Sequence, residues 1–69
     1  MVNTDKLRGL IVENRLTQDK VATELGITPR TFYRKMERGV FNSDEIEQMI
    51  NLLHIQDPVA VFFAEEVTS

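Results

Sequence analysis

The chain has 69 residues, no cysteine and a formal net charge of −3. This length gives one small domain, taken as residues 1–69, and the lack of cysteine leaves no disulfide to stabilise it. No apolar run approaches the ~18 residues that a membrane-spanning helix needs. The first residues also lack the basic and apolar parts of a signal peptide. We therefore expect one cytoplasmic domain that does not bind a membrane.

Charge is distributed unevenly along the sequence. Residues 1–40 hold all eight Lys and Arg against five acidic residues, whereas residues 41–69 hold six acidic residues and no basic one. Such asymmetry is typical of proteins that bind nucleic acid, although two ordinary solvated faces would give the same count. The overall acidic balance predicts weak non-specific DNA affinity, because neutralising phosphates supplies most of that affinity.

The first predicted helix covers about residues 4–14. Asn3 is placed to cap its N-terminus. Leu7, Leu10 and Ile11 recur at the i, i+3, i+4 spacing of a buried helix face.

The next two predicted helices cover residues 18–25 and 29–38. Gly26 follows the first of them, and glycine reaches the left-handed conformation that ends a helix. Thr28 can cap the second helix, and Pro29 suits its first position, where no N–H is needed. A helix end and a helix start this close together have the spacing of a helix-turn-helix.

The outer face of the predicted helix 29–38 is basic. Val21, Ala22 and Leu25 share a face of the preceding helix and would pack against Phe32 and Met36. Six residues then remain on the exposed side of the helix: Arg30, Thr31, Tyr33, Arg34, Glu37 and Arg38. Three arginines and a tyrosine on one face suit phosphates and guanine edges.

Two further helices are predicted over residues 43–54 and 58–65. Asn42 and Glu45 form a capping box at the start of the first. Its apolar face comprises Ile46, Met49, Ile50 and Leu53. Asp57 and Pro58 open the last helix.

The last predicted helix carries more apolar residues than one helix face can bury. We expect Val59, Phe62 and Phe63 to point inward, which leaves Val61 over and Leu52 partly exposed. The surplus predicts a protein interface. The alternative is that the tail folds back and buries nearly all of these side chains. The candidate interface residues are Leu52, Ile55, Val59, Val61, Phe62 and Phe63.

Residues 17–32 resemble the helix-turn-helix of the lambda repressor and Cro superfamily, also termed XRE-type. Its typical pattern is T-Q-x-x-h-A-x-x-h-G-h-[ST]-x-x-T-h. The chain matches it with Thr17, Gln18, Val21, Ala22, Leu25, Gly26, Ile27, Thr28, Thr31 and Phe32. The rest is similar to short single-domain regulators of temperate phages of Gram-positive bacteria. One departure is Lys35, where the superfamily usually has an apolar residue.

The resemblance implies an all-α fold, a compact five-helix bundle with a helix-turn-helix, in a bacterial cytosol. It also implies that Gln18 and Thr17 touch a phosphate, and Lys35 and Arg38 are further candidates for phosphate contacts. Ordinary solvation of a helix end is the alternative for Arg34, Lys35 and Arg38. For base contacts we select Arg30 and Arg34 first, followed by Thr28, Pro29, Thr31 and Tyr33.

Catalysis is not expected from this sequence. His54 is the only histidine, and the chain has no cysteine and no glycine-rich phosphate loop. We therefore predict no catalytic residue, no metal, no cofactor and no small-molecule substrate.

Two functions fit these features. The first is a DNA-binding transcriptional regulator of the phage Cro or repressor type, which binds a double-stranded operator, as a homodimer since one short helix contacts few base pairs. The second is a protein-binding modulator or antirepressor that pairs with a partner repressor and alters its DNA occupancy. The acidic second half and the surplus apolar residues favour this second function. A gel shift with the chain alone, and then with a partner, distinguishes the two.

Overall fold

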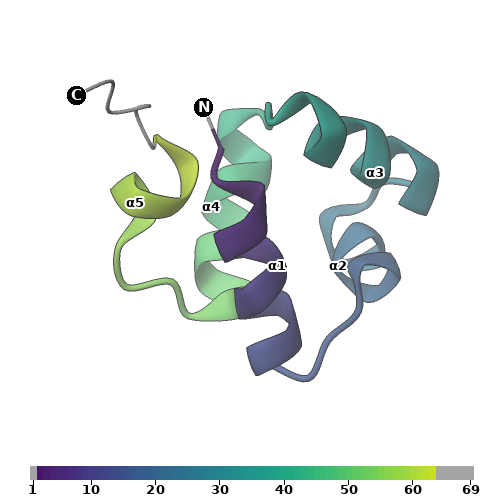
Figure 1. Ribbon diagram of the computed structural model, residues 1–69. Helices are drawn as coiled ribbons and strands as arrows, with labels where there is room; N and C mark the ends of the chain where they lie inside the picture. Colours follow the sequence, from purple (N-terminus) through teal and green to yellow (C-terminus); the bar gives the residue numbers. More distant parts are fainter. Residues whose placement is uncertain (1, 64–69) are drawn as a thin grey trace.

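The computed structural model describes residues 2–63, which form five α-helices and no strand. The helices are α1 (Thr4–Glu13), α2 (Gln18–Leu25), α3 (Pro29–Arg38), α4 (Ser43–Leu53) and α5 (Pro58–Phe62). In Figure 1, α2 and α3 lie on one side of the molecule and α5 lies on the other, with α1 and α4 between them. The all-α fold class predicted from the sequence is confirmed.

Every helix begins at a side chain that caps its N-terminus, which is why the helix starts were visible in the sequence. The cap oxygen accepts a backbone N–H three residues later, at distances from 2.8 Å at Asn42 to 3.3 Å at Asp57. Asn42 and Glu45 form the full capping box, because the Glu45 side chain also accepts the Asn42 N–H at 2.9 Å. The other three caps are Asn3, Thr17 and Thr28.

The bend between α2 and α3 depends on Gly26. This residue has φ +75°, in the left-handed region, and the Ile27 N–H donates to the Ala22 carbonyl at 3.0 Å. Gly39 ends α3 in the same way, with φ +70°. The two glycines therefore fix where α3 begins and ends relative to the rest of the chain.

The core lies where α1, α2, α3 and α4 meet, and α5 covers one end of it. Leu7, Val21, Ala22, Phe32 and Met49 are completely buried. The rings of Phe32, in α3, and Phe41, which follows that helix, pack in a tilted arrangement with their centroids 5.5 Å apart. The α3 helix is thus anchored by its inner face, and its outer face is left to solvent.

The segment before α1 ties distant parts of the chain together. The Val2 N–H donates to the Gly39 carbonyl at 3.1 Å, and the Asn3 N–H donates to the Val61 carbonyl at 2.6 Å. At the other end of α1, the Asn14 side-chain amide donates to the Leu53 carbonyl at 3.1 Å. These bonds link α1 to the end of α3, to α5 and to the end of α4.

The predicted inward face of the last helix is confirmed for Phe62 and was wrong for Val59 and Phe63. Val59 and Phe63 are 64% and 57% exposed, whereas Val61 and Phe62 are buried. The helix ends at Phe62, before the predicted boundary, and residues 64 and 65 of the predicted range lie outside the described residues. A helix this short is oriented by its tie to Asn3 and not by a repeating apolar stripe.

None of the helices described between residues 2 and 63 is long and apolar enough to cross a membrane.

Candidate nucleic-acid interface

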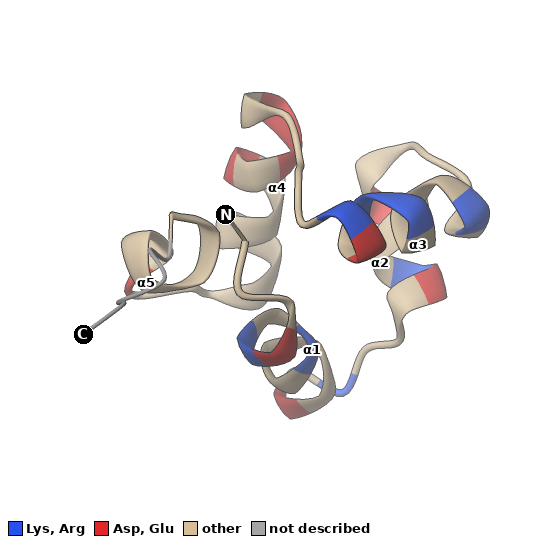
Figure 2. Cartoon of the chain, turned by 45° about the horizontal axis from the view of Figure 1, so that its top comes forward, with Lys and Arg blue, Asp and Glu red and all other residues tan. Residues whose placement is uncertain are grey.

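The outer face of α3 carries the candidate DNA-contacting residues. Phe32 and Met36 are buried, and Arg30, Arg34 and Arg38 on the other side of the same helix are exposed. Figure 2 shows basic residues gathered along α3, whereas the first turn of α4 is acidic. Arg30 and Arg34 are one helical turn apart, so both guanidinium groups can enter one groove.

The start of α3 holds its hydroxyls in a local network. The Thr28 hydroxyl accepts the Thr31 N–H at 3.2 Å and donates to the Thr31 hydroxyl at 2.9 Å. Pro29 between them is half-buried. These three candidates for base contacts therefore lie together at the N-terminus of α3, the end where phosphates are also favoured.

Tyr33 lies on the flank of α3 that faces α2. The ring is 46% exposed, and its hydroxyl donates to the Asp19 carboxylate on α2. This hydrogen bond is the main reason that the pKa of Tyr33 is raised above its ordinary value, with desolvation and the negative charge of Asp19 adding to it. The sequence analysis missed Asp19, because nothing local to either residue indicates the pairing.

Lys35 lies on the opposite flank and is paired with a buried acid. Its ammonium nitrogen is 2.5 Å from the Glu45 carboxylate, whose side chain is only 5% exposed. The other Glu45 oxygen accepts the Asn42 N–H, so both carboxylate oxygens are bonded. This pair explains how a lysine occupies a position that is usually apolar in the resembling superfamily. An ammonium has three donors, so the phosphate contact predicted for Lys35 would have to form beside the Glu45 bond.

The remaining candidates for phosphate contacts lie at both ends of the motif. Thr17 is exposed and accepts the Lys20 N–H at 3.1 Å, and Gln18 next to it is half-buried. Arg38, in the last turn of α3, lines a groove of about 440 Å³ together with Arg34 and Lys35. Phosphates on either side of a groove could therefore meet α2 at one side and the end of α3 at the other.

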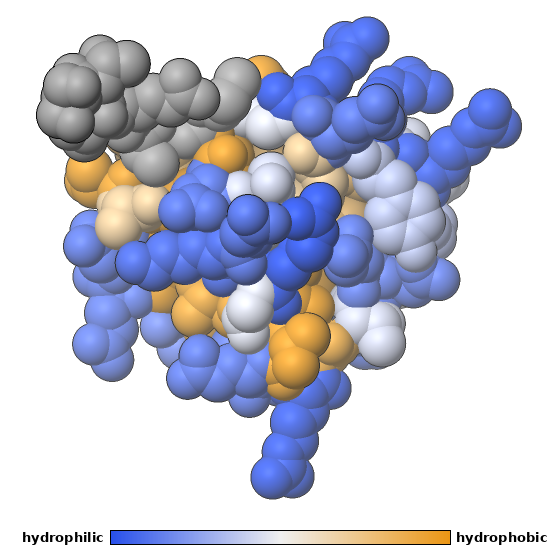
Figure 3. Space-filling view, in the orientation of Figure 1, coloured by the Kyte–Doolittle hydropathy of each residue, from blue (hydrophilic) through white to orange (hydrophobic). Residues whose placement is uncertain are grey.

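The candidate protein-interface residues are not all on the surface. Ile55, Val61 and Phe62 are buried in the core, so they are not available to a partner in this fold. Val59 and Phe63 are exposed on α5. In Figure 3, apolar surface near α5 is separated by hydrophilic side chains from a second apolar area lower in the view.

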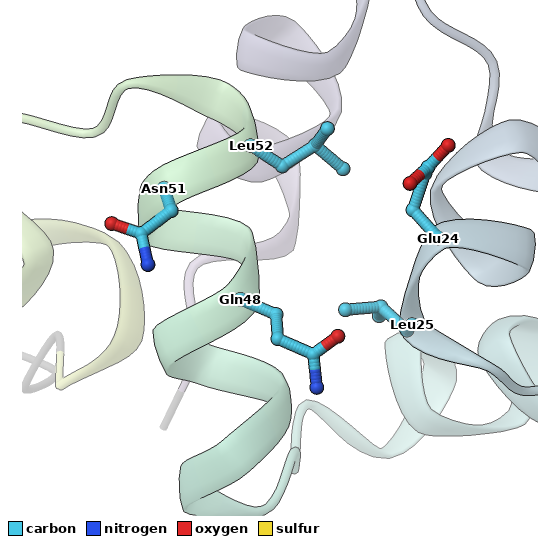
Figure 4. Close-up of a pocket in the computed structure, with 5 residues that line it drawn as sticks. All are labelled: Glu24, Leu25, Gln48, Asn51 and Leu52. Carbon is cyan, nitrogen blue, oxygen red and sulfur yellow. The ribbon is translucent and has the colours of Figure 1, made fainter.

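Leu52 is half-buried beside a groove between α2 and α4. The groove has a volume of about 340 Å³ and is lined by Glu24, Leu25, Gln48, Asn51 and Leu52. Figure 4 shows Leu52 of α4 opposite Glu24 of α2, and Gln48 of α4 opposite Leu25 of α2, while Asn51 points away from the gap. Each helix therefore contributes both an apolar and a polar side chain to the groove.

His54, the only histidine, ends α4 through its backbone conformation. It is the C-cap of α4 with φ 53°, its N–H donates to the Ile50 carbonyl, and its side chain is exposed. It is thus a C-cap residue in the left-handed conformation, the role that Gly26 has in α2 and Gly39 in α3.

Together, α2, the bend at Gly26 and the exposed basic face of α3 define a helix-turn-helix of the XRE type, a class of DNA-binding regulators. The family model described as "Antitoxin Xre-like helix-turn-helix domain" matches residues 11–54, and the chain belongs to that family. No curated protein and no solved structure matches the chain. The matched segment runs from the second half of α1 to the C-cap of α4, so it includes every candidate DNA-contacting residue.

Proposed function

We propose that the chain is a sequence-specific transcriptional regulator of the phage Cro or repressor type, which binds an operator through α3. The observation that carries this proposal is the placement of Arg30 and Arg34. Both are exposed on the outer face of a helix whose inner face is anchored by Phe32. The family match to a helix-turn-helix domain supports the same function.

Arginine chemistry fits a major groove. A guanidinium can donate two parallel hydrogen bonds to guanine, and each such pair contributes about 1–3 kcal/mol of discrimination. Thr17, Gln18 and Arg38 would bond phosphates and set the register of α3 on the duplex. Thr28 and Thr31 would present hydroxyls at the end of α3 that enters the groove.

One copy of α3 contacts too few base pairs for a useful specific affinity. The proposal therefore includes a homodimer on an operator with two half-sites, about 34 Å apart for neighbouring turns of DNA. Binding to such an operator would show a steep dependence on protein concentration.

The test begins with a pool of duplexes of random sequence, from which the wild-type chain selects a site. Arg30→Ala and Arg34→Ala are each expected to weaken binding to that site by about 1–3 kcal/mol. Arg8→Ala is the matched control, because Arg8 is on α1 and pairs with Asp5 at 2.9 Å. Failure to select any duplex would contradict direct DNA binding. Equal behaviour of all three variants would contradict the assignment of base contacts to Arg30 and Arg34.

The second candidate function is a protein-binding modulator or antirepressor, which pairs with another repressor and alters its DNA occupancy. The exposed Val59 and Phe63 on α5 favour it, as does the absence of any basic residue from residues 41–69. The word antitoxin in the name of the matching family also fits a protein partner. A gel shift in which the chain is inactive alone, and changes the mobility of DNA only when a partner repressor is added, would support this function over the first.

A further inference from the structure

The hydrogen bond between Tyr33 and Asp19 places a carboxylate beside the candidate DNA-binding surface. Asp19 is exposed at the second position of α2, directly after Gln18, a candidate for a phosphate contact. Its carboxylate accepts the hydroxyl of Tyr33, which belongs to the outer flank of α3. Among the ion pairs found within residues 2–63, none involves Asp19. Its negative charge is therefore offset by the N-terminus of α2 but by no paired basic side chain, and it lies where phosphates would approach.

We propose that Asp19 is a specificity-determining residue of this surface. Its charge lowers the affinity for duplexes of arbitrary sequence, and its hydrogen bond holds the Tyr33 ring in one position beside Arg30 and Arg34. The inference rests on the proposed DNA-binding function and extends it to a residue that makes no attractive contact with a phosphate.

The charge acts on every complex in which a phosphate approaches the start of α2, and non-specific complexes have little else to offset it. These complexes are held almost entirely by phosphate contacts, so a carboxylate about 7 Å from a phosphate reduces their affinity by roughly threefold in water at low salt. The reduction diminishes as salt is added, because screening shortens the range of the interaction. A duplex bound through arginine–guanine contacts carries the same penalty, but those contacts still hold it when non-specific complexes have become weak.

The hydrogen bond acts on specific complexes. An exposed tyrosine ring samples several rotamers, and the bond to Asp19 selects one of them, in which the ring lies on the side of α3 facing α2. A Tyr33 ring that is held in one rotamer before binding favours the DNA sequences whose groove accommodates the ring in that rotamer, because less side-chain entropy is lost on binding. Asp19 thus lowers non-specific affinity through its charge, and raises the ratio of specific to non-specific affinity through its hydrogen bond to Tyr33.

The experiment compares Asp19→Asn with Glu24→Gln. Both substitutions remove one negative charge from α2, but Glu24 pairs with Lys20 at 3.6 Å and lines the groove toward α4 (Figure 4). Binding is measured at low and high salt, on a mixed-sequence duplex and on the duplex that the wild-type chain selects from a random pool. Asp19→Asn should raise affinity for the mixed duplex about threefold at low salt. Affinity for the selected duplex should rise less, and Glu24→Gln should change the ratio of the two affinities much less.

A second measurement reports on the hydrogen bond itself. Tyr33 is the only tyrosine and the chain has no tryptophan, so absorbance during an alkaline titration follows this side chain alone. Asp19→Asn should lower the pKa of Tyr33 back toward its ordinary value, and Glu24→Gln should leave it unchanged. An unaltered titration in Asp19→Asn would overturn the proposed pairing, whatever the DNA result.

The possible outcomes separate a failure of the role of Asp19 from a failure of the proposed DNA-binding function. If the wild-type chain selects no duplex, the DNA-binding function and this inference both fail. If it selects one, and Asp19→Asn and Glu24→Gln alter the specificity ratio equally, only the role of Asp19 is overturned.

Discussion

The α3 helix is held by two polar side-chain contacts that differ in their surroundings. On one flank, Lys35 pairs with the buried Glu45 of α4. On the other flank, Tyr33 donates to the exposed Asp19 of α2. Tyr33 and Lys35 are two residues apart, and about 100° of rotation per residue sends their side chains to opposite sides of the helix. The α3 helix is therefore connected to a different neighbouring helix on each side.

Burial decides what each contact can do. Glu45 has lost its water and depends on the Lys35 ammonium and the Asn42 N–H to offset that loss. Asp19 and Tyr33 both remain in contact with solvent, so their bond contributes little to stability and is accessible to a ligand. The comparison indicates that the Lys35–Glu45 contact stabilises the fold more than the Tyr33–Asp19 contact does, and under the proposal above the second contact adjusts the binding surface.

The largest expected effect comes from breaking the buried pair. Lys35→Met leaves the Glu45 carboxylate buried beside a single neutral donor, and we expect it to destabilise the fold by roughly 1–3 kcal/mol, since Lys35 is itself partly hydrated. Urea unfolding followed by circular dichroism measures this change. The double variant Lys35→Met with Glu45→Gln should recover part of the loss. Equal stability of the single and double variants would show that the charge pair is not what holds this flank.

The second largest effect on stability is expected at the bend before α3, because this bend fixes where the whole helix begins. Gly26→Ala should destabilise by about 1–2 kcal/mol, because alanine is strained at φ +75° although the space around this position is empty. Gly9→Ala is the control, since Gly9 is within α1 and a Cβ there also meets nothing. This second substitution should stabilise by up to about 1 kcal/mol. If both substitutions changed the urea midpoint in the same direction, the backbone conformation would not be what matters at Gly26.

A smaller effect is expected on the exposed flank. Tyr33→Phe removes the hydroxyl and keeps the ring, so the urea midpoint should move far less than in Lys35→Met. Urea unfolding of Tyr33→Phe and Lys35→Met under the same conditions measures the difference between their midpoint shifts. A midpoint shift as large as that of Lys35→Met would mean that the Tyr33–Asp19 contact also maintains the fold.

The smallest effect is a dependence on alkaline pH. The pKa of Tyr33 is raised in the folded chain above the unfolded value of 10.0, because its hydroxyl donates to Asp19. The stability contributed by this bond is therefore fully present below pH 10 and is lost as pH rises through the folded pKa. The difference in unfolding midpoint between wild type and Tyr33→Phe should shrink between pH 8 and pH 11. A difference that grew with pH would contradict the direction of the shift.

The parts of the fold that could be predicted from the sequence are those set by local chemistry. Capping residues and glycines act within a few positions, so the bounds of α2 and α3 and the bend at Gly26 followed from the sequence. The exposed basic face followed from helical periodicity in the same way. Both polar contacts of α3 were missed because they join residues ten and fourteen positions apart, and only the packing of α3 brings those residues together.

The orientation of α5 could not be predicted for a different reason. A helix of five residues is too short to express a repeating apolar face, and a backbone bond to Asn3 decides which side chains point inward. The prediction for Val59 and Phe63 applied a periodicity rule where the helix has barely more than one turn. The same tie explains why Val61 is buried instead of lying on the surface.

The ties made by the segment before α1 also determine which fragment of this chain could fold. The matched family segment, residues 11–54, excludes Val2, Leu7, Val61 and Phe62, all of which are buried in the core. It also excludes the N–H groups that bond the carbonyls of Gly39 and Val61. A peptide of residues 11–54 alone would lack core side chains from both ends of the chain. We therefore expect the segment that folds as one cooperative unit to be longer than the segment that the family model matches.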